Sequence, residues 1–327
     1  MTQLNFEGEA PGGSSQRRVM WVGKLTGAVI CVAAVVCAAI VAVTRQSGTP
    51  SNTAPPGQAQ PIRYLGVYEP GSPGSYAGVD GFTRTVGRKP NLVTYYSSWG
   101  EQFQSAFART AYEHGASTIV QIDPTNISLA RIADGKYDSY LLSFANAVAA
   151  FHRQVIISFG HEMNGYWYTW GYHNTSPATF VAAWRYIVTF FRQHSVDNVK
   201  WLWQVNSLSS GTGPAHDWWP GSQYVTWVGI DGYYYLPGNT FENVFDPVFA
   251  AIRQFTQDPI LIAETAVGPQ AGQSRGIKDL FAGIRSQDYM GLVWFDQHST
   301  GGLYQGENWR LEGDRTAIAE FRKALKG

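Results

Sequence analysis

The sequence of 327 residues is poor in charged residues and in cysteine. Charged side chains make up 15% of it, whereas an ordinary soluble domain has about a quarter. The 24 basic and 24 acidic residues cancel, so the wide positive field that a nucleic-acid backbone attracts is missing. Both cysteines, Cys31 and Cys37, lie in one apolar stretch, which leaves no disulfide framework or thiolate metal site elsewhere. These shortages argue against a nucleic-acid partner and against cysteine chemistry.

Phosphate-binding and zinc-binding motifs are missing as well. Neither GxGxxG nor GxxxxGK[ST] occurs in the chain. His161 and Glu162 could begin a zinc-binding HExxH motif, but Gly165 occupies the position of the second histidine. We therefore expect neither a metal ion nor a cofactor.

The N-terminal part contains one long apolar run. Residues 25–43 carry no charge and are long enough to cross a bilayer core of about 30 Å, which predicts a transmembrane anchor. Three basic residues precede this run and Arg45 alone follows it closely, so residues 1–24 are expected in the cytoplasm and the rest of the chain outside. The Arg17-Arg18 pair leaves open a cleaved export signal and a secreted protein.

A polar segment separates this run from the main domain. Residues 44–61 are rich in Ser, Thr, Pro, Gly and Gln and offer little to bury, which predicts a flexible linker. The domain from 62 to 327 then holds 20 basic and 22 acidic residues. Its nearly neutral charge suits an uncharged ligand.

Strand-like and helix-like patterns alternate through the main domain. Short apolar, β-branched or aromatic runs lie at 62–68, 91–96, 117–122, 154–160, 199–204, 227–231, 260–264 and 291–295. Several lack in-out alternation, as expected of parallel strands covered on both faces. Helical periodicity occurs at 101–115, 138–152, 176–193, 243–256, 273–285 and 315–326. The α/β pattern predicts a single (β/α)8 TIM barrel, and two smaller doubly wound domains are the alternative.

Two glutamates occur where such a barrel carries its chemistry. Glu162 follows the run 154–160, and Glu264 ends the run 260–264. Because the carboxyl ends of barrel strands share one mouth, both carboxylates are expected there. One neutral and one ionised carboxyl group can together cleave a glycosidic bond. For either glutamate alone, an ion pair with an arginine is the alternative, but the pair predicts a glycoside hydrolase.

Aromatic and amide side chains also follow the predicted strands. Sugar rings stack their C–H faces on aromatic rings and need hydrogen bonds for their hydroxyls. The candidate glycan-binding residues of this kind are Trp99, Trp167, Asn206, Tyr233 and Trp294. For any single tryptophan, core packing is the alternative. Asp231 and Asp296 are expected to bond backbone amides or an arginine rather than a metal.

Four motifs together resemble one known family. They are HEMNGYWYTWG at 161–171, GIDGYY at 229–234, IAET at 262–265 and LVWFD at 292–296. This combination resembles the catalytic domain of glycoside hydrolase family 26, which contains β-mannanases and some enzymes acting on mixed-linkage β-glucan or β-xylan. The likeness covers about residues 62–327 and implies a (β/α)8 barrel with a retaining mechanism.

The resemblance also implies roles for individual residues. Glu162 would be the acid/base and Glu264 the nucleophile. His161 would orient a carboxylate or a sugar hydroxyl, Tyr233 would lie beside the nucleophile, and Trp167 and Trp294 would line sugar subsites. Departures from the mannanase pattern at 158–160, 168–169 and 266 leave the substrate open.

The resulting hypothesis is a membrane-tethered, extracytoplasmic, retaining endo-β-glycosidase. Its partner would be a β-linked polysaccharide resembling β-mannan or β-glucan, and the protein would be a monomer. Two alternatives remain: a catalytically silent glycan-binding protein, and a transglycosylase or trimming enzyme for the cell's own exopolysaccharide.

Overall fold

The computed structural model describes residues 61–298, 307–311 and 313–327. The predicted leader (1–24), the predicted membrane segment (25–43) and nearly all of the predicted linker (44–61) lie outside the described residues. Across the described ranges, none of the helices combines the length and the apolar character that a membrane span requires.

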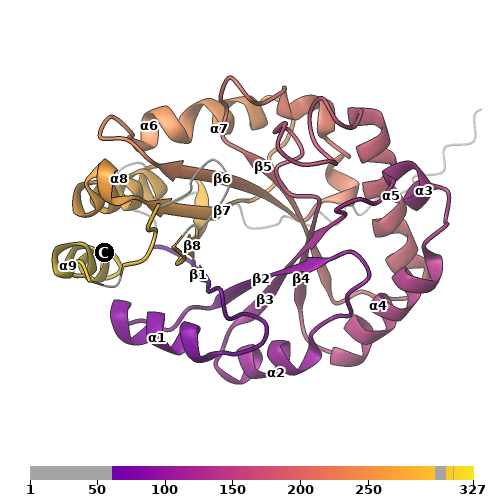
Figure 1. The fold of residues 1–327 in the computed structure, drawn as a ribbon, viewed down its shortest axis with the longest axis horizontal. Coiled ribbons are helices and arrows are strands. Elements are labelled where there is room, and N and C mark those ends of the chain that lie inside the picture. The colour runs from indigo at the N-terminus through magenta and orange to yellow at the C-terminus, as the bar shows by residue number, and fades with distance from the viewer. Residues whose placement is uncertain (1–60, 299–306, 312) are drawn as a thin grey trace, which may run out of the picture. The chain divides into compact units, whose positions relative to one another are not determined.

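Eight parallel strands close into a barrel, in which each strand pairs with the next along the chain and β8 pairs with β1 (Figure 1). They are β1 (Tyr64–Tyr68), β2 (Leu92–Ser98), β3 (Ser117–Asp123), β4 (Val155–Phe159), β5 (Val199–Asn206), β6 (Trp227–Tyr234), β7 (Ile260–Val267) and β8 (Tyr289–Phe295). Each strand overlaps one of the eight predicted runs. The (β/α)8 barrel fold predicted from the sequence is therefore confirmed.

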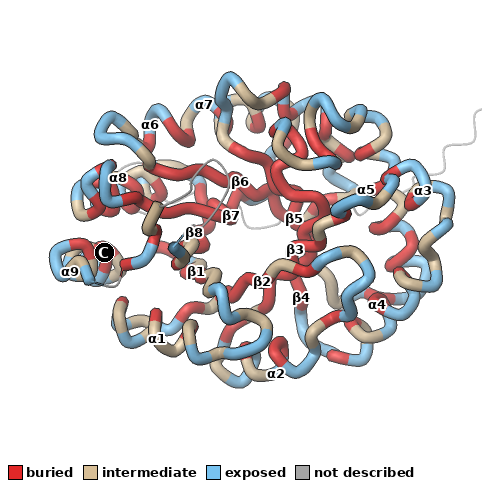
Figure 2. Tube along the Cα trace, viewed as in Figure 1, coloured by how far each residue is buried: buried red, intermediate tan, exposed pale blue. Residues whose placement is uncertain are grey.

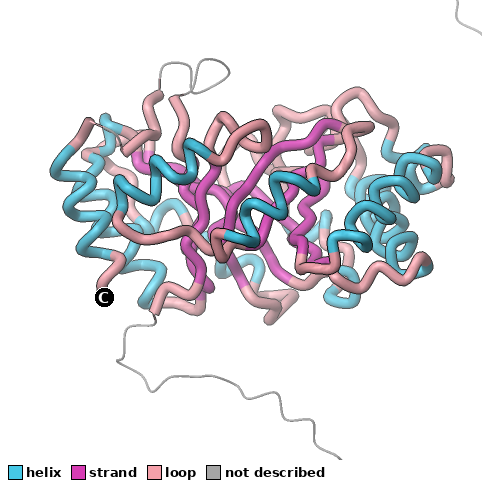
Figure 3. Tube along the Cα trace, turned by 90° about the horizontal axis from the view of Figure 1, so that it is seen from below, coloured by secondary structure: helices cyan, strands magenta, loops and turns pink. Residues whose placement is uncertain are grey.

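Helices surround the barrel, as the side view in Figure 3 shows. They are α1 (Ala77–Val86), α2 (Ser105–Glu113), α3 (Leu129–Ala133), α4 (Asp138–Phe151), α5 (Pro177–Gln193), α6 (Phe241–Val244), α7 (Asp246–Ile252), α8 (Gln273–Ser286) and α9 (Arg315–Ala324). Short 3₁₀ turns η1 (Ala215–Trp218), η2 (Ser222–Tyr224) and η3 (Pro269–Ala271) lie in the loops. The helix α5 begins where Ser176 accepts a hydrogen bond from the Thr179 backbone, with Pro177 in its first turn.

Three helical regions differ from the sequence prediction, and one of them is the five-residue helix α3, which was not predicted. The helix α1 was not predicted, because Gly78 and Gly81 lower the helix propensity of this segment. The single helix expected at 243–256 is divided into α6 and α7. Pro247 supplies no backbone N–H at the start of α7, so the chain begins a new helix there instead of continuing α6.

Apolar side chains fill two separate regions, one between the sheet and the helices and a smaller one inside the barrel. Figure 2 shows the strands almost wholly buried and the outer faces of the helices exposed. Leu92, Ile119, Ile156 and Leu202 belong to the inner cluster. Two residues further along the same strands, and therefore on the same inward side, lie the buried polar residues Thr94, Gln121, Ser158 and Gln204. The barrel thus becomes polar toward its carboxyl end, where the site lies.

Candidate active site

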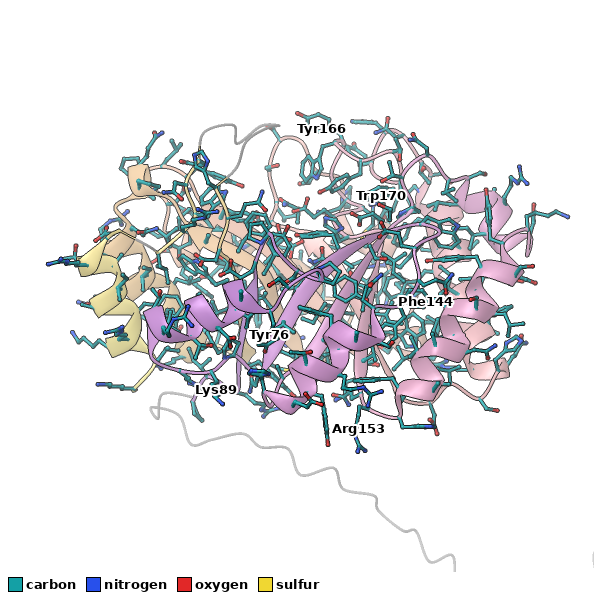
Figure 4. All side chains as sticks on the ribbon, turned by 60° about the horizontal axis from the view of Figure 1, so that its bottom comes forward. Tyr76, Lys89, Phe144, Arg153, Tyr166 and Trp170 are labelled. Carbon is teal, nitrogen blue, oxygen red and sulfur yellow. The ribbon has the colours of Figure 1, made fainter. Side chains whose placement is uncertain are left out.

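The loop that carries the predicted motif 161–171 lies at the carboxyl end of the barrel. Figure 4 shows Tyr166 and Trp170 at one end of the molecule, with Lys89 and Arg153 at the opposite end. Lys89 and Arg153 precede β2 and β4, so they mark the amino ends of the strands. Glu162 and its neighbours in sequence are therefore placed at the mouth where barrel enzymes carry out chemistry.

Backbone geometry aims Glu162 into this mouth. Gly160 and Glu162 both adopt the left-handed conformation, with φ of 56° and 53°. A side chain at Gly160 would crowd Phe180 and Trp170, whose ring atoms would lie 3.0 and 3.2 Å from its Cβ. The Glu162 amide donates to the Gln204 carbonyl at 2.8 Å, which fixes the turn to β5. A left-handed glutamate costs roughly 1–2 kcal/mol, so the fold holds this side chain in place against a local preference.

Asn206 is held so that its side chain meets Glu162. The backbone N–H of Asn206 donates to Asn164 Oδ1 at 2.8 Å, and Asn164 Nδ2 donates to the backbone carbonyl of Asn206 at 2.9 Å. This reciprocal pair ties the loop after β4 to the end of β5. The Asn206 side chain is left to donate from Nδ2 to Oε1 of Glu162.

Trp167 donates a hydrogen bond to the other oxygen of the Glu162 carboxyl group. Its indole Nε1 donates to Glu162 Oε2 at 2.7 Å. Gly165 permits this arrangement, because a Cβ there would lie 2.3 Å from the Trp167 ring. The predicted site residues Asn206 and Trp167 are thus both brought to Glu162.

The surroundings of Glu162 favour its neutral form. Burial raises the pKa of this carboxyl group to about 7, and repulsion from Glu264 adds to the increase. His161 and the hydrogen bonds from Asn206 and Trp167 oppose it. Near neutral pH, Glu162 can therefore both donate and accept a proton.

Glu264 turns inward at a β-bulge and meets two tyrosines. The register between β6 and β7 shifts so that Ile230 pairs with Ile262 but Asp231 pairs with Glu264. Tyr233 donates its hydroxyl hydrogen to Oε1 of Glu264, and Tyr96 of β2 donates to Oε2. Burial, together with the charge of Glu264, raises the pKa of both tyrosines well above the usual value, so both hydroxyls remain donors. Both oxygens of Glu264 therefore accept a hydrogen bond from a phenol.

Asp231 lies buried beside the two glutamates. Its oxygens accept from Gln204 Nε2 at 2.9 and 2.8 Å. Burial, then repulsion from Glu264 and Glu162, raises the pKa of Asp231 well above the usual value. Asp296 instead accepts from the Leu311 backbone amide at 3.1 Å, as expected for a strand-end aspartate. Within the ranges that the structure describes, no three His, Cys, Asp or Glu side chains are grouped to hold a metal ion.

His161 is linked to a carboxylate and a phenol rather than to Glu162. Its Nδ1 lies 3.0 Å from Asp123 Oδ1, and its Nε2 lies 3.0 Å from the Tyr168 hydroxyl. Burial lowers the pKa of His161, but attraction to Asp123 and the hydrogen bond that His161 donates to it outweigh this effect and raise the pKa to about 9. The ring is therefore a buried cation near neutral pH.

The structure does not bring Trp294 or Trp99 to the glutamates. Trp294 is fully buried outside the barrel wall, where it donates to the Trp309 carbonyl at 3.2 Å and packs against Phe321 of α9. The predicted place of Trp294 in a sugar subsite is therefore wrong. The next residue of β8, Phe295, points to the opposite side of the strand, and its ring stacks on Tyr68. Trp99 packs against Tyr137 and Tyr140 at the start of α4.

Sequence reasoning missed three residues of the site, Tyr96, Asp123 and Tyr168. Tyr96 ends a predicted strand and Asp123 directly follows another, so the rule that selected the glutamates could have selected them too. Tyr168 is one of several aromatics in its loop, and the sequence gives no sign of which one faces the glutamates.

One family description matches a large part of the barrel. Residues 123–275, which run from the end of β3 to the start of α8 and include both glutamates, match the family model described as Glycosyl hydrolase family 26.

Curated relatives resemble the chain over only part of their own length. Endoglucanase H of Acetivibrio thermocellus is 29% identical over 272 residues, which cover 78% of this chain and 29% of that protein. Beta-1,3-xylanase TXYA of a Vibrio species is 26% identical over 129 residues, covering 39% of this chain and 26% of that protein. The chain thus spans less than a third of the length of these relatives.

Solved structures share the barrel. The catalytic domain of the Bacillus sp. JAMB-750 GH26 endo-beta-1,4-mannanase superposes with a TM-score of 0.63 at 16% identity, covering 81% of this chain and 85% of that one. The YdhT protein of Bacillus subtilis gives 0.62 at 16% identity, with 82% and 87% covered. At this identity the likeness concerns the fold. The family match over residues 123–275 confirms the predicted resemblance of this barrel to glycosyl hydrolase family 26.

Proposed function

We propose that the chain is a retaining endo-β-glycosidase in which Glu264 is the nucleophile and Glu162 the acid/base. Glu264 attacks the anomeric carbon as the bond to the leaving oxygen breaks, and Glu162 gives that oxygen its proton. The covalent glycosyl-enzyme is then opened by water, which loses a proton to Glu162 and frees Glu264. Each residue ends the cycle in its starting protonation state.

The observation that carries this proposal is the difference between the two carboxyl groups. Glu162 is buried with a pKa raised to about 7, which suits a group that must give and take a proton. Glu264 receives hydroxyl hydrogens on both oxygens, which suits a group that must stay ionised to attack. Two carboxyl groups with such different surroundings suit the two different roles that this chemistry requires.

The substrate we propose is a neutral β-linked polysaccharide. The similarity to endoglucanase H extends over 78% of this chain, which favours a β-glucan, and the mannanase and β-1,3-xylanase relatives make β-mannan and β-xylan the next candidates. Tyr166 lies next to Trp167 and is 46% exposed, so its ring is available to stack on a sugar at the rim of the mouth.

The test is a product profile. The full chain is incubated with mixed-linkage β-glucan, β-mannan, β-1,3-xylan and the producing cell's own exopolysaccharide, and the products are sized. Internal cleavage of at least one polymer, giving mixed short oligosaccharides, is expected, and longer products from a polymer of the cell itself would indicate a transglycosylase. Binding without cleavage of any of the four would contradict the proposal and favour a silent glycan-binding protein.

We further propose that residues 25–43 anchor the enzyme in the cell membrane, with the barrel outside the cell on the linker 44–61. A linker of this kind spans about 20–25 Å on average, which keeps the barrel close to the membrane surface. Protease treatment of intact cells should digest the barrel while the N-terminus stays protected. A mature N-terminus located after residue 43 would instead show a cleaved signal and a secreted enzyme.

We propose that the enzyme is a monomer, because both glutamates and the described side chains that contact them come from one barrel. Sedimentation should give the mass of a single chain at concentrations where the enzyme is fully active. Activity that disappears on dilution together with a dimer would contradict this.

A further inference from the structure

Three side chains form a hydrogen-bonded line that ends near both glutamates. Asp123 at the end of β3 bonds Nδ1 of His161, and Nε2 of His161 bonds the Tyr168 hydroxyl, each at 3.0 Å. His161 is only 2% exposed, whereas Tyr168 is half-buried at the mouth. The line therefore runs from the barrel wall toward the space that a substrate would occupy.

The positions of hydrogens along this line follow from the groups at its two ends. A carboxylate only accepts, so Nδ1 of His161 carries a proton and donates to Asp123. Because His161 is a cation near neutral pH, Nε2 also carries a proton and donates to the Tyr168 oxygen. The Tyr168 hydroxyl must then direct its own hydrogen elsewhere.

Among the described residues, Nε2 of His161 is the single hydrogen-bond partner of the Tyr168 hydroxyl. Its electrostatic neighbours are Glu162 first, then Glu264, Asp123 and Asp231, and the Tyr96 phenol also lies within reach. The hydroxyl hydrogen is therefore placed beside both catalytic carboxyl groups without a protein acceptor.

The Tyr168 ring is held rigidly in this position. It stacks on Trp170 with 4.3 Å between ring centroids and 9° between planes. Trp170 in turn donates from Nε1 to the His161 carbonyl at 2.9 Å, and Asn174 Nδ2 donates to the Tyr168 carbonyl at 2.9 Å. A fixed hydroxyl can discriminate between sugars by the direction of one oxygen.

We propose that Tyr168 determines substrate specificity by donating its hydroxyl hydrogen to a hydroxyl oxygen of the sugar bound between Glu162 and Glu264, and that Asp123 and His161 are positioning residues for this donor. The inference rests on the proposed glycosidase function. A sugar whose hydroxyl points toward Tyr168 gains a hydrogen bond that its epimer at that carbon cannot make. Because the donor is polarised by a cation behind it, this hydrogen bond is stronger than that of an isolated phenol.

The test compares Tyr168→Phe with the matched control Tyr76→Phe on the polymer of the four that wild type cleaves fastest. Tyr76 is half-buried, packs against Phe107 and His114, and lies away from the mouth (Figure 4). Tyr168→Phe should lower kcat/KM about 5- to 50-fold on this polymer and less on a poorly cleaved one. Tyr76→Phe should stay within about twofold of wild type.

A double-mutant cycle tests the positioning role. His161→Gln alone should lower kcat/KM, but in the Tyr168→Phe background its further effect on kcat/KM should shrink to less than half, while its effect on the melting temperature should remain. Fully additive losses in kcat/KM would show that His161 does not act through Tyr168.

The outcomes separate this inference from the proposed function. If wild type cleaves none of the four polymers, the proposed function fails. If wild type is active and Tyr168→Phe keeps its kcat/KM within twofold on every polymer, the specificity role of Tyr168 is overturned even where the variant melts at a lower temperature.

Discussion

Tyr233 donates its hydroxyl hydrogen to Oε1 of Glu264, and the two residues reach each other from the neighbouring strands β6 and β7. The next residue, Tyr234, points to the opposite side of β6 and bonds Asp279 of α8 at 2.8 Å. One tyrosine of this pair therefore contacts the proposed nucleophile, and the other contacts a helix on the outside of the barrel.

This contrast gives the first prediction. Tyr233→Phe removes a hydrogen bond to a charged carboxylate, which is worth about 1.5–3 kcal/mol, and should lower kcat about 10- to 150-fold. Tyr234→Phe should lower the melting temperature but leave kcat within about twofold. Steady-state kinetics of both variants on the same polymer decide the matter, and equal kcat losses would refute the distinction.

The second prediction separates the roles of the two glutamates by leaving group. An aryl glycoside whose leaving group is an acidic phenol needs little protonation as the bond breaks. Glu162→Ala should therefore lose about 10²- to 10⁴-fold of its activity on the polymer, but the first step on the aryl glycoside should slow far less. Glu264→Ala should be inactive on both. A Glu162→Ala variant that lost equal activity on the two substrates would contradict its assignment as the acid.

The third prediction concerns pH. Since Glu162 must be protonated to donate, kcat/KM should fall as the pH rises through about 7. Trp167 Nε1 donates to Glu162 and stabilises its ionised form, so Trp167→Phe should raise the pKa of Glu162 and move this limb to higher pH. Trp219 packs against Trp203 and Phe255. The control variant Trp219→Phe should therefore leave this limb of the pH profile of kcat/KM unmoved. A limb that shifts to lower pH in Trp167→Phe would count against the account.

The fourth prediction concerns stability. The pKa of His161 is about 9 in the folded protein against 6.5 as its ordinary value, so the stabilisation from its bound proton is fully present below pH 6.5 and is lost as the pH rises through 9. Wild type should therefore exceed His161→Gln in free energy of unfolding by about 3 kcal/mol more at pH 6 than at pH 9.5 or above. Chemical unfolding at both pH values measures this difference. A gap that does not change with pH would show that His161 is neutral in the folded protein.

The sequence was sufficient to predict the architecture and to place Glu162, Glu264, Asn206 and Tyr233 at the mouth of the barrel. Each of these residues lies at a strand end, and in a barrel all strand ends meet at one mouth regardless of their separation along the chain. The strands themselves were recognisable because buried parallel strands are short, continuous and apolar.

The same continuity explains the error at Trp294. A strand that is apolar on both faces has no alternation to show which of two neighbouring residues points inward, so Trp294 and Phe295 could not be told apart. The register of β8 depends on irregular pairing with β7, which a linear pattern does not encode. Tyr168 was missed for a related reason, since its direction is set by stacking on Trp170 within a loop.

The central claim is that Glu264 attacks the sugar and forms a covalent intermediate, and the configuration of the first product tests it most directly. Proton NMR follows the new reducing end while the wild-type enzyme cleaves its preferred polymer. Two displacements at the same carbon predict that the β-anomer appears first and the α-anomer follows only by mutarotation. Appearance of the α-anomer first would show a single displacement by water and would contradict the role given to Glu264.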